Sequence, residues 1–117
     1  MEFNEIDDTG IIMINADGII INNAEDGTDL IGNIYYEGYD KIIIHENGLT
    51  PDFFDLKNGI AGEILQKFSN YRVQLAIVGD FTKYTSKSIK DFIYESNKTG
   101  RINFVASIED ARNVLAK

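Results

Sequence analysis

The chain has no cysteine, one proline and one histidine among its 117 residues. The absence of cysteine excludes disulfide bonds and thiolate metal sites, and it leaves the redox compartment undecided. No basic-then-apolar segment opens the chain, and no apolar run approaches the length needed to span a bilayer. We therefore expect a cytoplasmic protein with no membrane partner.

Basic residues are also scarce, with 11 lysines and arginines against 19 aspartates and glutamates. The resulting net charge of −8 repels phosphate backbones and gives no sign of a basic patch. We therefore expect no nucleic-acid partner. Apolar content of 44% and charged content of 26% suit a single globular domain over residues 1–117.

Two apolar runs dominate the middle of the chain, Ile42–Ile44 and Val73–Val78. Both are rich in β-branched residues and show little polar alternation, which is typical of strands covered on both faces. Such strands belong to parallel sheets that are flanked by helices. The segment between the two runs predicts the helix that connects them.

The start of the chain predicts short strands. Glu2–Ile6 is short and charged, which favours an edge strand. Ile11–Ile14 and Gly18–Ile21 are two further apolar runs, and the Asp17-Gly18 pair suits a tight hairpin between them. The alternative is one strand interrupted by a bulge. We expect two short strands.

Capping residues mark the helix starts. Asn23 precedes two acidic residues, as at a helix N-terminus, and Gly38 suits the end of that helix. Thr50 followed by proline begins a short helical turn. The remaining predicted elements are a main helix from near Asn58 that carries Leu56, Ile60, Ile64, Leu65 and Phe68, a helix from Thr85 or Ser86 to residues 97–100, a strand Ile102–Val105, and a last helix capped by Ser107.

Strands that alternate with helices in this way predict an α/β fold with right-handed crossovers. We expect a mixed, mainly parallel sheet of about five strands with about four helices. Apolar strand runs and helical stripes give the expected core. Its members are Ile43, Phe54, Ile64, Leu65, Phe68, Leu75, Ile77 and Phe92.

Polar residues follow the two apolar runs, and they form the candidate site. His45 and Glu46 come after the first run, and Asp80 follows the second. Ligands of open α/β sheets bind beyond the carboxyl ends of the strands, so these side chains are expected along one rim. His45 could act there as a general base, because imidazole titrates near neutral pH. The simpler interpretation is polar residues that end strands and cap loops.

A second set of candidates precedes the main helix. Gly59 and Gly62 expose backbone amides that suit an anion, and Lys57 lies beside them. Close packing of the helix is the competing explanation. The spacing matches no P-loop, dinucleotide fingerprint or metal-ligand motif, so we expect no cofactor and no metal. The candidate residues for ligand or partner binding are Lys57, Asn58, Gly59, Asn22 and Ser86.

Three segments carry a resemblance to known families: HENGLTPDFFDLKNGIAGEILQKF, YRVQLAIVGDF and KSIKDFIYESN. They resemble the bacterial domain-of-unknown-function family DUF4180, which implies no activity, cofactor or catalytic residue. The topology also resembles the STAS fold of sulfate transporters and anti-sigma-factor antagonists. Antagonists of that class carry Asp-Ser-Ser-Gly-Leu-Gly at the matching helix start, and phosphorylation of one serine switches their partner binding. The matching stretch here, Lys57 to Ala61, has the glycine but no hydroxyl.

Two functional hypotheses follow. The first is a non-enzymatic binding or regulatory module with a STAS-like fold that lacks the serine phospho-switch, because no complete catalytic set is recognisable. The alternative is a small enzyme or small-molecule binder that uses the rim of His45, Glu46 and Asp80. Convergence of these side chains on a partly apolar cleft would favour the alternative.

Overall fold

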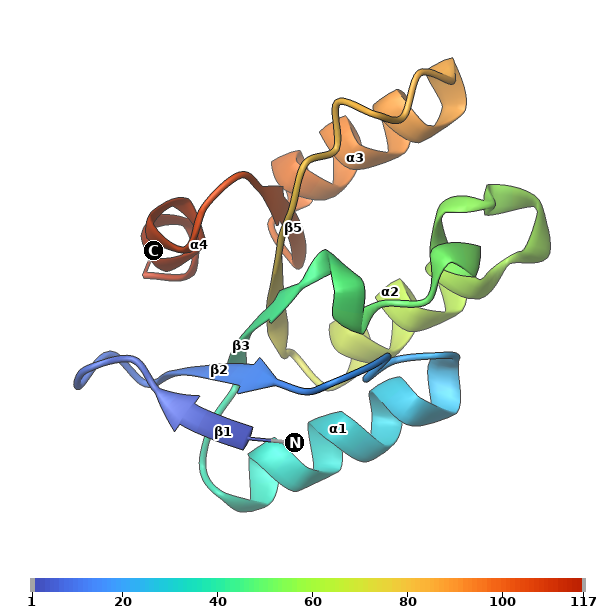
Figure 1. Ribbon diagram of the computed structural model, residues 1–117. Helices are drawn as coiled ribbons and strands as arrows, with labels where there is room; N and C mark the ends of the chain where they lie inside the picture. The colour runs from blue at the N-terminus through green and yellow to red at the C-terminus, as the bar shows by residue number, and fades with distance from the viewer. Residues whose placement is uncertain (1, 117) are drawn as a thin grey trace.

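A computed structural model describes residues 2–116, and its central feature is one five-stranded sheet (Figure 1). The strands lie side by side in the order of the sequence. The first two are antiparallel, and every later pair is parallel. Their bounds are β1 (Glu2–Glu5), β2 (Ile11–Asn15), β3 (Lys41–His45), β4 (Gln74–Val78) and β5 (Ile102–Val105).

Four α-helices cover this sheet, so the predicted fold class is confirmed. The sheet grows in one direction and its crossovers are right-handed, which places the first three helices on one face. The fourth helix follows the last strand and covers the opposite face (Figure 1). The helices are α1 (Ala24–Tyr36), α2 (Ile60–Asn70), α3 (Lys87–Thr99) and α4 (Ile108–Leu115), and three short turns, η1 (Glu46–Gly48), η2 (Pro51–Phe54) and η3 (Leu56–Asn58), connect β3 to α2.

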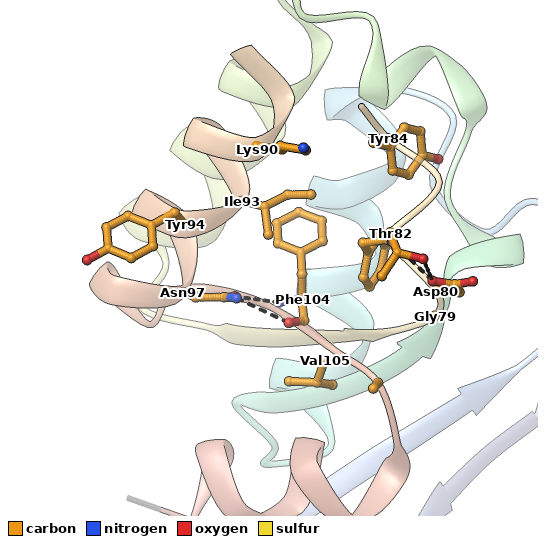
Figure 2. A pocket seen from close by; sticks show the side chains of 12 residues that line it. Gly79, Asp80, Thr82, Tyr84, Lys90, Ile93, Tyr94, Asn97, Phe104 and Val105 are labelled. Carbon is orange, nitrogen blue, oxygen red and sulfur yellow. Dashed lines mark hydrogen bonds between the residues drawn. The ribbon is translucent and has the colours of Figure 1, made fainter. Parts of the chain in front are cut away.

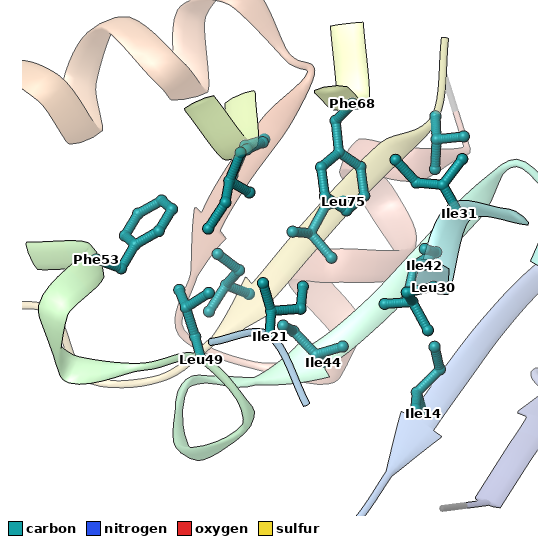
Figure 3. Close-up of a cluster of buried hydrophobic side chains, with 14 of the residues drawn as sticks. Ile14, Ile21, Leu30, Ile31, Ile42, Ile44, Leu49, Phe53, Phe68 and Leu75 are labelled. Carbon is teal, nitrogen blue, oxygen red and sulfur yellow. The ribbon is translucent and has the colours of Figure 1, made fainter. Parts of the chain in front are cut away.

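Each face of the sheet has its own core. The main core lies beneath α1, α2 and α3, and it includes Ile31, Ile44 and Phe68 (Figure 3). The smaller core lies beneath α4 and includes Ile43 and Leu115. Ile43 and Ile44 are adjacent in β3 and both fully buried, which is why the run showed no polar alternation.

The predicted helix starts are found at their capping residues. The Asn23 side chain accepts a hydrogen bond from the Asp26 amide at 2.9 Å. The Ser107 hydroxyl oxygen accepts one from the Asp110 amide at 3.1 Å. Each bond satisfies one of the amides that a helix N-terminus leaves without a partner.

The predicted hairpin at Asp17-Gly18 is wrong. The antiparallel pair is β1 with β2, closed by a turn in which the Ile6 amide donates to the Ile11 carbonyl at 2.9 Å. Residues 18–21 form no strand, because Ile20 and Ile21 both donate to the Gly48 carbonyl instead of pairing with β2. The run is apolar because Ile21 is fully buried in the main core.

The main helix begins at Ile60, two residues later than predicted. Gly59 has φ +78°, in the left-handed region that favours glycine, so the backbone turns there before the helix starts. Close packing is the wrong explanation for the two glycines. A Cβ added at Gly59 or Gly62 would meet no atom within 4 Å.

Two members of the predicted core are less buried than expected. Leu65 and Phe92 are only partly buried, and they pack against the margin of the main core. The other six expected members are buried. The helical stripes identified the correct faces, but they could not separate the centre of a face from its border.

The outer edge of β5 is closed by a side chain from α3. The Asn97 amide nitrogen donates to the Phe104 carbonyl at 3.2 Å, and its oxygen accepts from the Phe104 amide at 2.7 Å. Asn97 thereby occupies the position that a neighbouring strand would take. Because an open edge invites pairing with another chain, this arrangement protects the sheet.

We predict that Asn97→Asp lowers the free energy of unfolding by about 1–2 kcal/mol, because the carboxylate cannot donate to the Phe104 carbonyl. Chemical denaturation measures the change. Asn33→Asp, at an exposed position on α1, is the matched control and should change stability by less than about 0.5 kcal/mol. Equal effects of the two substitutions would contradict the role of Asn97.

Candidate functional site

The carboxyl ends of β3 and β4 form the rim that the sequence indicated. The two strands are parallel neighbours, and His45 pairs in register with Val78. Glu46 and Asp80 therefore extend just beyond adjacent strand ends. Their side chains nevertheless serve different purposes.

Glu46 joins the end of β3 to the loop after β4. Its carboxylate accepts hydrogen bonds from the Asp80 amide at 3.3 Å and from the Lys83 ammonium at 2.7 Å. The hydrogen bond with Glu46 is the main cause that raises the pKa of Lys83. Gly79 makes the arrangement possible, because a Cβ there would lie 2.7 Å from the Glu46 carboxyl carbon.

Asp80 is occupied by its own loop. One carboxylate oxygen accepts from the Thr82 hydroxyl at 2.5 Å and from the Thr82 amide at 3.0 Å. These hydrogen bonds favour the ionised form and lower the pKa of Asp80. The carboxylate is therefore a fixed negative charge at neutral pH.

His45 does not converge with the two carboxylates. Among the described residues, the His45 side chain forms no hydrogen bond or ion pair with Glu46 or Asp80. It is exposed and borders a small cavity of about 150 Å³ that also includes Asn15 and Ala16. The three residues thus share a rim without sharing a site.

The remaining candidates are dispersed over three helix starts. Asn58 uses both ends of its amide, donating to the Asp52 carbonyl and accepting from the Ile60 amide, each at 2.9 Å. Ser86 caps α3 by accepting from the Ile89 amide at 3.2 Å. These contacts explain both side chains as parts of the fold, and whether either binds a ligand stays a prediction.

Asn22 and Lys57 contribute backbone contacts only. The Asn22 amide donates to the Asp26 carboxylate at 2.9 Å, ahead of α1. The Lys57 amide lies 3.4 Å from a carboxylate oxygen of Asp55, ahead of α2. Gly59 borders a shallow depression of about 520 Å³ next to α2. The five candidates therefore do not form one site.

A cavity whose lining includes only Asp80 of the predicted site residues lies beyond the carboxyl ends of β4 and β5. It measures about 830 Å³ and opens between α3 and the loop that leads to it from β4 (Figure 2). We call it the β4–β5 groove. Its lining residues are Gly79, Asp80, Phe81, Thr82, Tyr84, Lys90, Ile93, Tyr94, Asn97, Phe104, Val105 and Ala106.

Six aromatic residues form the structure behind the groove, and we call them the aromatic cluster. Phe54 stacks on Tyr84 with ring centroids 4.4 Å apart, and Phe81 meets Phe104 edge to face at 5.2 Å. Burial raises the pKa of the Tyr84 phenol. The cluster comprises Phe53, Phe54, Phe81, Tyr84, Phe92 and Phe104.

A signal for the groove was present in the sequence. Phe81 and Tyr84 lie within four residues of Asp80, in a loop after a buried strand. Large aromatic side chains in such a loop must pack on something, and here they pack on η2 and β5. Their partners are distant in the sequence, so the spacing alone could not reveal the cavity.

Within residues 2–116, no three histidine, aspartate or glutamate side chains converge as a group that could hold a metal ion. None of the helices in this same range is long and apolar enough to cross a membrane.

Residues 6–115 match the family model DUF4180, described as a domain of unknown function. The chain belongs to the DUF4180 family. The resemblance seen in the sequence is confirmed at this level. Comparison of the chain with curated proteins and with solved structures gives no match.

We predict that Gly79→Ala lowers the free energy of unfolding by about 1–3 kcal/mol, because the new Cβ displaces Glu46 from its two hydrogen bonds. Chemical denaturation measures this change. Gly62→Ala is the control and should be neutral or stabilising by up to about 1 kcal/mol, since a Cβ there meets no neighbour and α2 gains a better helix former.

The same change should cost less in a Glu46→Gly background, which removes the three nearest atoms that the new Cβ would meet. An equal cost in both backgrounds would contradict the proposed contact between the introduced methyl group and Glu46.

We predict that the pKa of Asp80, followed by an NMR pH titration of its carboxyl carbon, lies below the ordinary aspartate value and rises in Thr82→Val. The depressed pKa stabilises the folded state above the ordinary aspartate pKa, and this contribution is lost as the pH falls through the folded-state value. Thr85→Val, an exposed threonine in the same loop, should leave the pKa of Asp80 unchanged. An unaltered pKa in Thr82→Val would refute the role of the hydroxyl.

Proposed function

We propose that this domain is a non-enzymatic binding module and that the β4–β5 groove is its binding site. The observation that carries the proposal is the cavity of about 830 Å³. Its size lies within the range of ligand sites, and its position beyond parallel strand ends is where α/β folds bind ligands. Apolar rings line it together with a few polar groups, as such sites require.

The positions of His45, Glu46 and Asp80 support binding over catalysis. A catalytic set needs a base within hydrogen-bond reach of the group that it activates. His45 forms no hydrogen bond with either carboxylate among the described residues, and Glu46 is held by Lys83 and a backbone amide. The rim therefore supports the binding hypothesis better than its enzymatic alternative.

A STAS-like regulatory role remains part of the proposal. The antiparallel first strand, followed by parallel strands in sequence order, supports the likeness. Residues 56–62 contain no hydroxyl side chain, so we propose a partner interaction without a phospho-switch. We also propose that the domain acts in the cytoplasm.

The groove favours a compact ligand or side chain over an extended peptide strand. An added strand would pair with the outer edge of β5, but Asn97 already holds the Phe104 amide and carbonyl there. The ligand must therefore be recognised through apolar contacts and through its polar groups, without backbone pairing to β5.

The test is a ligand screen by thermal shift, with hits confirmed by calorimetry on two tryptophan variants. Ala106→Trp fills the groove, and we expect it to weaken binding of the hits at least about tenfold. Ala16→Trp fills the cavity beside His45 instead and should leave affinity unchanged. Hits that lose affinity only in Ala16→Trp, or that are converted to products, would contradict the proposal.

A further inference from the structure

The β4–β5 groove carries charges of both signs at separate places. Lys90 projects from α3, and Asp80 lies on the loop after β4 (Figure 2). Lys90 takes part in none of the ion pairs observed within residues 2–116.

The Asp80 carboxylate, at the acidic end of the groove, has one oxygen that can accept a hydrogen bond from a ligand. One carboxylate oxygen of Asp80 accepts hydrogen bonds from Thr82, while the other oxygen makes no hydrogen bond among the described residues. The turn with Thr82 holds the carboxylate in place, so a ligand donor would meet a fixed acceptor. The wall between the two charges is aromatic and suits a flat ring.

We infer that the groove binds a small aromatic carboxylic acid that carries a hydrogen-bond donor at its opposite end. The carboxylate would face Lys90, the ring would lie against the partly exposed rings of Phe81 and Tyr84, and the donor would face Asp80. The inference rests on the proposed function of the groove as a binding site. It adds the chemical class and the orientation of the ligand.

A phosphorylated ligand fits these charges less well. A phosphate group carries up to two negative charges and is commonly held by several backbone amides or an arginine fork. The groove offers one lysine, and the Asp80 carboxylate would repel a second negative charge. A single carboxylate matches a single ammonium.

The inference is tested on the intact chain with four probes that share one ring. They are para-hydroxyphenylacetate, para-methoxyphenylacetate, the neutral alcohol tyrosol and the cation tyramine. Affinity is measured by titration of backbone amide NMR signals, which also locates each probe. We expect para-hydroxyphenylacetate to bind tightest and tyramine weakest.

Two substitutions test which groove residue contacts each end of the ligand. Lys90→Gln should weaken the binding of para-hydroxyphenylacetate by about twofold to fivefold, the range of an exposed ion pair, and leave the affinity for tyrosol unchanged. Lys98→Gln, at an exposed position on the same helix, is the control and should change neither. Asp80→Asn should reduce the preference for the hydroxyl probe over the methoxy probe.

The outcomes separate this inference from the proposed function. Tighter binding of tyramine than of the carboxylates in the groove would overturn the ligand class and leave the groove as the binding site. Binding of none of the four probes would also overturn the class. If, in addition, every hit of the wider screen survives Ala106→Trp, the groove itself is wrong.

Discussion

Contact between aromatic rings at the carboxyl end of the sheet is the interaction on which the rest of this structure depends. The aromatic cluster joins η2 to three consecutive segments from later in the chain: the loop after β4, α3 and β5. Aromatic pairs contribute about 0.5–1.5 kcal/mol beyond the area they bury, so the cluster can hold a loop that has little regular structure. The same loop carries Asp80 and Lys83, and its path is fixed further by Glu46, which lies against Gly79. The rings thus create the wall of the groove and position its acidic end.

Much of the fold was predictable because its signals are local. The apolar run at Ile42–Ile44 reflects burial on both sides of β3. Asn23 indicates a helix start because its side chain binds the amide of a residue three positions away. The strand predicted at Gly18–Ile21 is absent. The run is apolar because Ile21 is buried in the core, and this gives it the composition of a strand. Its true partner, the Gly48 carbonyl, lies well beyond any local window.

The candidate site was predictable only in part. Parallel strands end at one rim, which correctly brought His45, Glu46 and Asp80 to the same edge of the sheet. The carboxylates of Glu46 and Asp80 are held by the loop after β4, however, and His45 forms a hydrogen bond with neither of them among the described residues. The groove escaped prediction because α3 and the loop after β4 build it through contacts between distant residues. Sequence spacing shows which residues are neighbours along the chain. A cavity depends instead on the gaps left where separate elements pack together.

These features together support a domain whose rim is held rigid by Glu46 and whose binding surface lies one strand further along. The central claim is that ligands occupy the β4–β5 groove, and the most direct measurement is an NMR or crystal structure with a screening hit bound. The account predicts contacts from the ligand to Phe81, Tyr84 and Lys90. A hit seated against His45, or in the depression beside Gly59, with an empty groove would contradict it.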